Sequence, residues 1–208
     1  MNAGYLSLIL LCIMLILLAS GWKELYIRSI SHKGMLLFFV SWLIGMRLTV
    51  VIRQVHIQVV YFVVLALALL ILYVTQGFIH KLHLLSIGLL LGSLHFLVEQ
   101  LLVMDPILIV RNSAWQSALV LALVAVVLQR NAWEQIGAIS IGYLLGDLYQ
   151  SGIHKVDGNQ MLGLAGFQDQ WWLTVFTART ITIMVQFAYN SCRSVWKQWM
   201  NRNGSNRE

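Results

Sequence analysis

Charged residues and proline are scarce in this sequence. Asp, Glu, Lys and Arg make up 11% of the 208 residues, hydrophobic residues make up 59%, and the mean hydropathy is +0.77. Soluble domains usually contain about 25% charged residues, and a soluble core of this size could not bury so much apolar surface. There is one Pro and no low-complexity linker, which indicates one compact domain. The composition therefore predicts a protein embedded in lipid.

Motifs for metal binding and catalysis are also missing. Cys12 and Cys192 form no metal or disulfide pattern, and the sequence has no H-E-x-x-H, G-x-S-x-G or Walker glycine motif. The segment HFLVE, which begins at His95 and ends at Glu99, offers at most two zinc ligands, and catalytic zinc needs three. In the last apolar run, Arg179 stands where a rhodopsin would need a retinal-binding lysine. We therefore expect no enzymatic activity and no cofactor.

Long apolar runs alternate with short polar segments along the chain. A helix that crosses about 30 Å of hydrocarbon needs about 20 mainly apolar residues. Seven runs approach this length: about Ala3–Ser20, Gly34–Ile52, Gln58–Phe78, Leu82–Met104, Ser113–Gln129, Trp133–Tyr149 and Trp171–Tyr189. The predicted fold class is an all-α, polytopic transmembrane helix bundle of about seven spans. Residues 1–190 are predicted to form one transmembrane domain, and residues 191–208 a basic amphipathic cytoplasmic tail.

Lys and Arg are unevenly divided between the two alternating sets of connecting segments. The richer set should be cytoplasmic, which places the N-terminus outside and the C-terminus inside the cell. The richer set holds Lys23, Arg28, Lys33, Lys81, Arg130, Arg193, Lys197, Arg202 and Arg207, and the poorer set holds Arg53, Arg111 and Lys155. The net charge of +6 thus indicates contact with anionic lipid headgroups and not with nucleic acid.

Two basic segments are predicted to form helices that lie on the membrane surface. In WKELYIRSISHK, residues 22–33, and CRSVWKQWMNR, residues 192–202, apolar residues share one helix face and charged residues lie opposite. Docking of a cytoplasmic protein partner, or self-association, is the alternative use of these faces. The predicted anchoring residues are Trp22, Arg28, Arg193, Trp196, Lys197 and Trp199, and Trp171 and Trp172 are predicted to join an interfacial aromatic belt.

Few charged or imidazole side chains lie inside the apolar runs. Each charge costs about 2.5–3.5 kcal/mol at a helix centre, so these groups should face the bundle interior and have partners. The predicted buried polar layer consists of Arg47, His95, Glu99, Asp147 and Arg179. We expect the two arginines to pair with Glu99 or Asp147. Three roles remain open for this layer: fixing helix packing, lining a binding cavity or ion path that opens to the outside, and acid–base catalysis by His95 and Glu99.

Glycines accompany this layer at helical spacing. Gly88 and Gly92 share a helix face with His95 and Glu99, and Gly142 and Gly146 recur in the sixth run. Small residues let transmembrane helices approach closely. The fourth, sixth and seventh runs are therefore predicted to pack together.

The segment from Ser151 to Gln170 is the one sizeable outer loop. Its glycines predict an irregular path, and apolar residues such as Phe167 suggest that it rests on the bilayer or plugs the bundle. His154, Asp157 and Asp169 are interpreted as solvated loop residues in preference to cation ligands, because their spacing matches no metal motif.

Three features resemble a known family. The opening MNAGYLSLILLCIMLILLASGWKELYIR, the segment IGYLLGDLYQSG and the chain length are similar to the YphA-like integral membrane proteins of spore-forming Bacillota. This resemblance implies a Gram-positive plasma membrane and no defined chemistry. The size is also similar to that of the substrate-binding subunits of energy-coupling-factor vitamin transporters, which have six spans. The first run, LSLILLCIMLILLASG, lacks the small-residue motif of those subunits.

The sequence as a whole predicts a multi-pass plasma-membrane protein without its own enzymatic activity. The preferred role is that of a structural or accessory protein whose polar layer fixes helix packing. The alternative is a transporter or solute-binding membrane subunit with an outward-facing polar cavity.

Overall fold

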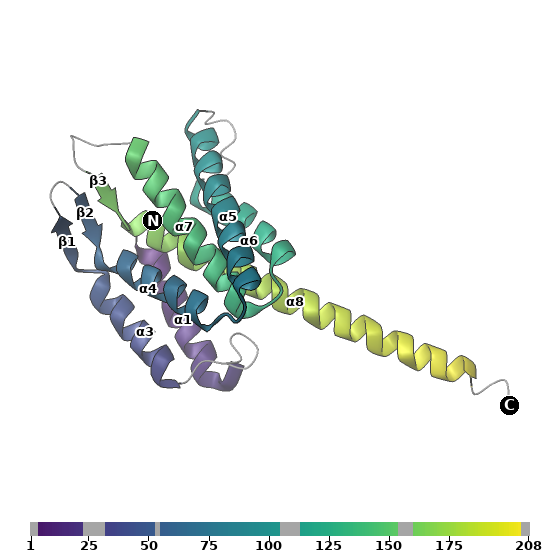
Figure 1. The fold of residues 1–208 in the computed structure, drawn as a ribbon. Helices are drawn as coiled ribbons and strands as arrows, with labels where there is room; N and C mark the ends of the chain where they lie inside the picture. Colours follow the sequence, from purple (N-terminus) through teal and green to yellow (C-terminus); the bar gives the residue numbers. More distant parts are fainter. Residues whose placement is uncertain (1–3, 23–31, 53–54, 105–112, 154–159, 205–208) are drawn as a thin grey trace.

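The computed structural model describes residues 4–22, 32–52, 55–104, 113–153 and 160–204, and it is mainly helical (Figure 1). For residues 195–204 the backbone alone is described. The helices are α1 (Tyr5–Leu17), α3 (His32–Gly45), α4 (Val59–Val74), α5 (Phe78–Met104), α6 (Ser113–Leu128), α7 (Ala132–Ile153) and α8 (Ala165–Gly204), and a π-helical turn, η1 (Leu18–Trp22), follows α1. The strands are β1 (Thr49–Ile52), β2 (Val55–Gln58) and β3 (Gln160–Leu162).

Each of the seven predicted runs overlaps one of these helices. Within the described ranges, α5 is the one helix that is both long enough and apolar enough to cross a membrane. Four further apolar helical stretches are shorter: Tyr5–Gly21, Lys33–Gly45, Val59–Val74 and Trp115–Leu128. The mainly helical class is therefore confirmed, whereas seven spans and their orientation stay predictions.

A small sheet corrects the all-α prediction. The second run was expected to be helical as far as Ile52, but α3 ends at Gly45 and the chain forms β1. β1 pairs antiparallel with β2, and β2 pairs parallel with β3 (Figure 1). The β-branched residues of Thr49–Ile52 favour an extended backbone over a helix. Beyond Gly45 the chain turns back so closely that a Cβ there would lie 3.2 Å from the backbone nitrogen of Val60.

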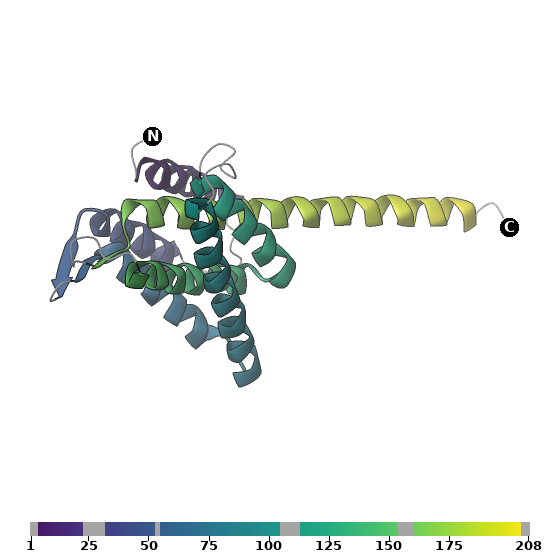
Figure 2. The same ribbon diagram turned by 90° about the horizontal axis from the view of Figure 1, so that it is seen from above.

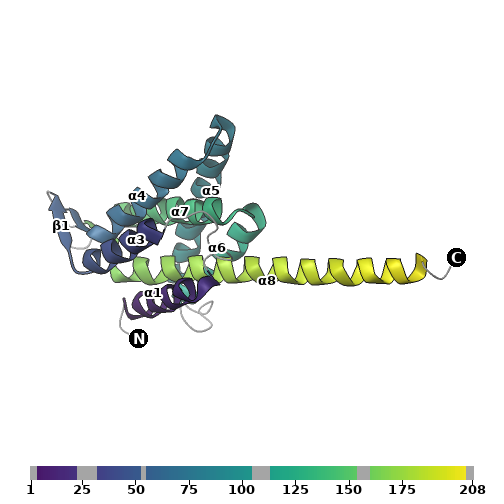
Figure 3. The ribbon, with the colours of Figure 1, turned by 90° about the horizontal axis from the view of Figure 1, so that it is seen from below.

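The last helix is much longer than the seventh predicted run. α8 begins inside the predicted outer loop, at Ala165, and continues without a break for 40 residues, or about 60 Å. Residues 191–204 of the predicted tail thus continue the same helix. Figures 1, 2 and 3 show that the C-terminal part of α8 extends past the other elements, whereas α1 runs alongside its N-terminal part.

The early start of α8 also moves two tryptophans into the core. Trp171 and Trp172 were predicted to lie in an interfacial belt, but each is only 2% exposed. The ring of Trp171 stacks on Trp42 at 5.0 Å, and that of Trp172 stacks on Phe39 at 6.1 Å. Because residues 165–170 already form a helical turn and a half, both rings lie deeper than the run boundary implied.

α7 is the central helix of the bundle. The residues from Gln135 to Leu144 are all buried, and α7 packs against α4, α5, α6 and α8. By contrast, large apolar side chains on α3, α4 and α5 face outward, for example Leu37 at 71% exposure and Ile79 at 78%. A soluble monomer rarely exposes such continuous apolar surface, so this exterior fits a hydrocarbon environment.

The most extensive contact between two helices of the bundle joins α5 to α7, which lie side by side in Figure 1. A Cβ on Gly92 would lie 2.9 Å from the Cβ of Leu145, and a Cβ on Gly142 would lie 2.7 Å from that of Leu91. A Cβ on Gly88 would likewise meet the side chain of Ile141. The two backbones can approach this closely because glycine has no side chain.

Replacement of Gly142 by Ala is expected to destabilise the protein by about 1–3 kcal/mol, the usual cost of overpacking. The new methyl group would overlap Leu91 unless α5 and α7 separated. Thermal unfolding of the purified protein in detergent measures this change. Gly152→Ala is the matched control on the same helix, because no atom lies within 4 Å of its Cβ position. Equal stability of the two variants would contradict the close contact.

Candidate functional site

Three of the five predicted polar-layer residues line the same cavity, which has a volume of about 440 Å³. His95 and Glu99 come from the C-terminal half of α5, and Asp147 comes from the corresponding part of α7. The close approach of α5 and α7 brings these side chains together. The close approach of the two helices at their glycines therefore determines where this cavity lies.

His95 lines this cavity and is only 3% exposed. Its ring lies 4.6 Å, between centroids, from the ring of Tyr143. A Cβ on Gly146 would overlap the imidazole, so this glycine makes room for the histidine. The Nδ1 atom of His95 has no hydrogen-bond partner among the described residues. A buried polar atom without a partner is costly, and here it belongs to a residue that lines a cavity.

The carboxylates of Glu99 and Asp147 each accept a hydrogen bond through one of their two oxygens. The side-chain amide of Gln170 donates to Oε1 of Glu99 at 2.9 Å, and the backbone N–H of Gly163 donates to Oδ2 of Asp147 at 2.8 Å. Gly163 has φ +71°, a conformation that favours glycine. A carboxylate has two oxygens that can accept hydrogen bonds, so each group keeps further acceptor capacity.

The predicted outer loop takes part in the cavity. Met161, Leu164 and Phe167 line it, together with Gln150 and Ser151 at the end of α7. Asp169, interpreted from the sequence as a solvated residue, has a structural role instead. Its carboxylate accepts the N–H groups of Gly4 at 2.7 Å and Ser7 at 2.6 Å, which caps the N-terminus of α1.

Arg179 belongs to a different polar group. It is 3% exposed, and its Nη1 donates to Oε1 of Gln135 at 3.2 Å. The Nε2 of Gln135 donates in turn to the hydroxyl of Thr182 at 3.1 Å. These residues join α7 to α8 nearer the N-terminal end of α7, away from the residues that line the cavity. The sequence predicted that Arg179 is buried, but it gave no sign of the hydrogen bond to Gln135.

Arg47 was predicted to be buried, and this is wrong. Its side chain is exposed, because α3 ends two residues earlier and Arg47 lies in the turn that leads into β1. In that turn the backbone N–H of Arg47 donates to the carbonyl of Ile44 at 3.4 Å. Arg47 is not among the residues that line the cavity.

Comparison with models of known protein families gives a match. The family model for YphA-like integral membrane proteins matches residues 31–206, a stretch that includes every cavity residue. The chain belongs to this family. Neither the curated proteins nor the solved structures give a match. The family defines the chain as an integral membrane protein and carries no specific activity.

The predicted surface anchors of this YphA-like protein lie mostly outside the described parts. Arg28 lies outside the described residues, and nothing is described of the side chains of Trp22, Trp196, Lys197 and Trp199. Arg193 is described and is exposed on α8. Its exposure is compatible with contact with lipid headgroups or with a partner.

The separate positions of Glu99 and Arg179 predict additive effects on stability. Glu99 lines the polar cavity and accepts a hydrogen bond from Gln170, whereas Arg179 is not among the cavity residues and donates to Gln135. Effects of substitutions at separate sites add to within about 0.3–0.5 kcal/mol. Unfolding free energies of Glu99→Gln, Arg179→Gln and the double variant measure this. A double variant no less stable than either single variant would show that the two residues act as one pair.

Proposed function

We propose that this chain is a multi-pass protein of a bacterial plasma membrane that binds a small cationic solute in the polar cavity. The N-terminus lies outside and the C-terminus inside, as the distribution of Lys and Arg predicts. In this orientation the cavity, at the C-terminal ends of α5 and α7, opens to the outer side. The basic inner segments contact anionic lipid headgroups.

The observation that carries this proposal is the charge of the lining. Glu99 and Asp147 line the cavity, and its described lining residues include no Lys or Arg. Each carboxylate keeps acceptor capacity after its contact with Gln170 or Gly163. The unpartnered Nδ1 of His95 adds a polar atom that can accept an N–H group. A primary ammonium or a guanidinium matches this set of acceptors, and the volume lies in the range of about 300–1,000 Å³ typical of small-ligand sites.

The position of Arg179 favours binding of a cationic solute over conduction of a cation through the bundle. A guanidinium stays protonated, and this one is buried between α7 and α8 with Gln135. A cation that moved inward along the interface of these helices would be repelled by it. The cavity is therefore interpreted as a closed-end site of a solute-binding subunit.

Catalysis by His95 and Glu99 is not part of the proposal. An imidazole that acts as an acid or base is normally oriented by a hydrogen bond to its other nitrogen. The Nδ1 of His95 has no such partner in the described parts of the chain. This arrangement supports a non-enzymatic role.

A structural or accessory role is the second candidate. The glycine contact between α5 and α7 and the Gln135–Arg179–Thr182 hydrogen bonds both fix helix packing. These features favour a protein whose polar groups hold the bundle together and whose basic inner face meets lipid, a partner protein or a second copy.

Ligand-dependent thermal stability distinguishes the two candidates. We expect small alkylammonium or guanidinium compounds to stabilise the purified protein, by about 2.7 kcal/mol at 100 times Kd, whereas carboxylates of the same size do not. Glu99→Gln and Asp147→Asn should weaken binding about tenfold or more, because hydrogen bonds to charged groups contribute about 1.5–3 kcal/mol. Glu134→Gln is the control, since Glu134 lies at the other end of α7.

The binding role is supported if cations stabilise the wild type and Glu134→Gln but do not stabilise the two cavity variants. Stabilisation by anions, or unchanged cation binding in both cavity variants, contradicts it. If no compound in the panel has an effect, the structural role is favoured.

A further inference from the structure

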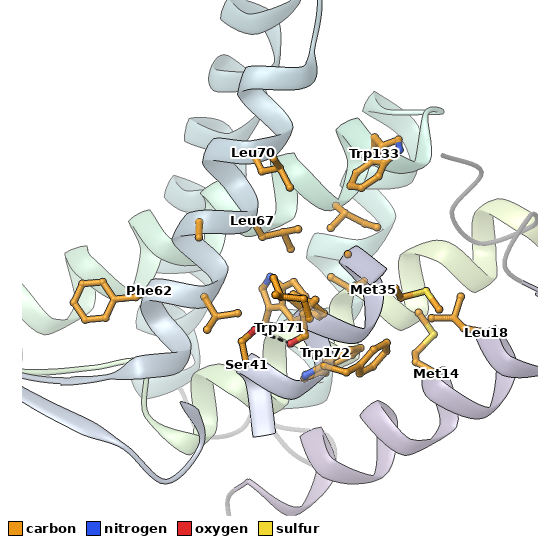
Figure 4. Close-up of a pocket in the computed structure, with 18 residues that line it drawn as sticks. Met14, Leu18, Met35, Ser41, Phe62, Leu67, Leu70, Trp133, Trp171 and Trp172 are labelled. Atoms are coloured by element: carbon orange, nitrogen blue, oxygen red, sulfur yellow. Dashed lines mark hydrogen bonds between the residues drawn. The ribbon is translucent and has the colours of Figure 1, made fainter. Parts of the chain in front are cut away.

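A second cavity, of about 470 Å³, lies between α1, α3, α4, α7 and α8 (Figure 4). It shares no lining residue with the polar cavity. Its lining is apolar apart from Ser41 and the indole N–H groups of its tryptophans, and the hydroxyl of Ser41 already donates to the carbonyl of Phe38 at 2.9 Å. The chemistry of this cavity therefore suits a hydrocarbon chain and not a polar solute.

This apolar cavity opens onto the lipid-facing surface. Leu37 on α3 and Phe62 and Leu70 on α4 line it, and they are 71%, 39% and 53% exposed. Its floor is formed by the buried rings of Trp171 and Trp172 (Figure 4). In a membrane protein, the medium that meets such an opening consists of lipid acyl chains.

A positively charged residue lies next to the lining of the apolar cavity. Gly34, at the start of α3, lines the cavity, and the neighbouring Lys33 is exposed. Lys33 forms no ion pair or hydrogen bond with a residue in the described parts of the chain. The start of a helix also favours negative charge because of the helix dipole. Trp133, a residue type common at membrane interfaces, lines the same cavity from the start of α7.

We propose that the apolar cavity holds an acyl chain of one anionic phospholipid whose phosphate group lies beside Lys33. The exposed wall admits the chain from the bilayer, the tryptophan floor provides its contact surface, and the lysine selects an anionic headgroup. This site does not depend on the cation-binding role of the polar cavity.

Native mass spectrometry of the delipidated protein tests the site. The probes are phosphatidylglycerol and phosphatidylcholine with the same acyl chains. We expect the wild-type protein to bind phosphatidylglycerol about fivefold more tightly, the effect of one Lys near an anionic headgroup. Lys33→Gln should remove this preference and retain chain binding.

Ser41→Leu should weaken the binding of both lipids about tenfold, because the larger side chain would take up part of the cavity (Figure 4). Ser86→Leu is the matched control. Ser86 is also a helical serine bonded to its own helix, at 2.9 Å to the carbonyl of Leu82, but it is exposed on α5 outside the cavity. We expect Ser86→Leu to bind both lipids as tightly as the wild type does. Equal affinity of the wild type for the two lipids, or unchanged binding in Ser41→Leu, would overturn the proposal.

A measurement on the wild type keeps the test valid if Ser41→Leu does not fold. Bromine atoms on the acyl chains quench nearby tryptophan fluorescence, and Trp171 and Trp172 form the cavity floor. Brominated phosphatidylglycerol should quench more strongly than brominated phosphatidylcholine at equal concentration. The same quenching by both lipids would contradict the site.

Discussion

The backbone contact between α5 and α7 is the constraint on which the rest of the structure depends. Gly92 and Gly142 let the backbones of the two helices approach closely, and Gly146 leaves space for the imidazole of His95. Because α7 is buried along its central turns, any separation from α5 would also disturb its contacts with α4, α6 and α8. The same contact brings Glu99 and Asp147 to one cavity, so the packing of the bundle determines the geometry of the site.

The polar groups of α7 are arranged in layers along its contact with α8. Asp147 lies in the polar cavity, and four residues earlier on α7 the Tyr143 hydroxyl lies 2.6 Å from the hydroxyl of Thr174. Nearer the N-terminal end of α7, Gln135 accepts a hydrogen bond from Arg179. Buried polar groups in a membrane must find partners within the protein. In the proposed function, the acidic group near the C-terminal end of α7 accounts for the preference for a cation, and the basic group near its N-terminal end accounts for the closed end of the site.

Local pattern was enough to predict part of the fold and site. Apolar runs located the seven α-helices that the structure describes, and four-residue spacing placed His95 and Glu99 on the glycine face of α5. The β3 pairing, the capping of α1 by Asp169 and the Gln135–Arg179 contact join residues far apart in sequence. These contacts depend on tertiary packing and leave no periodic signal. Arg47 was misplaced because Thr49–Ile52 is as apolar as a helix end, and hydropathy alone does not distinguish a strand from a helix.

The accessibility of the cavity tests the central claim most directly. In a Cys12→Ser, Cys192→Ser background, Gln150→Cys places a thiol in the cavity, and Arg130→Cys places one before the start of α7, at its other end. Intact cells are then treated with a membrane-impermeant maleimide. We expect that Gln150→Cys is labelled from outside and protected by a bound cation, whereas Arg130→Cys is labelled only after permeabilisation. Labelling of Gln150→Cys only after permeabilisation, or labelling that no cation reduces, would contradict an outward-facing cation site.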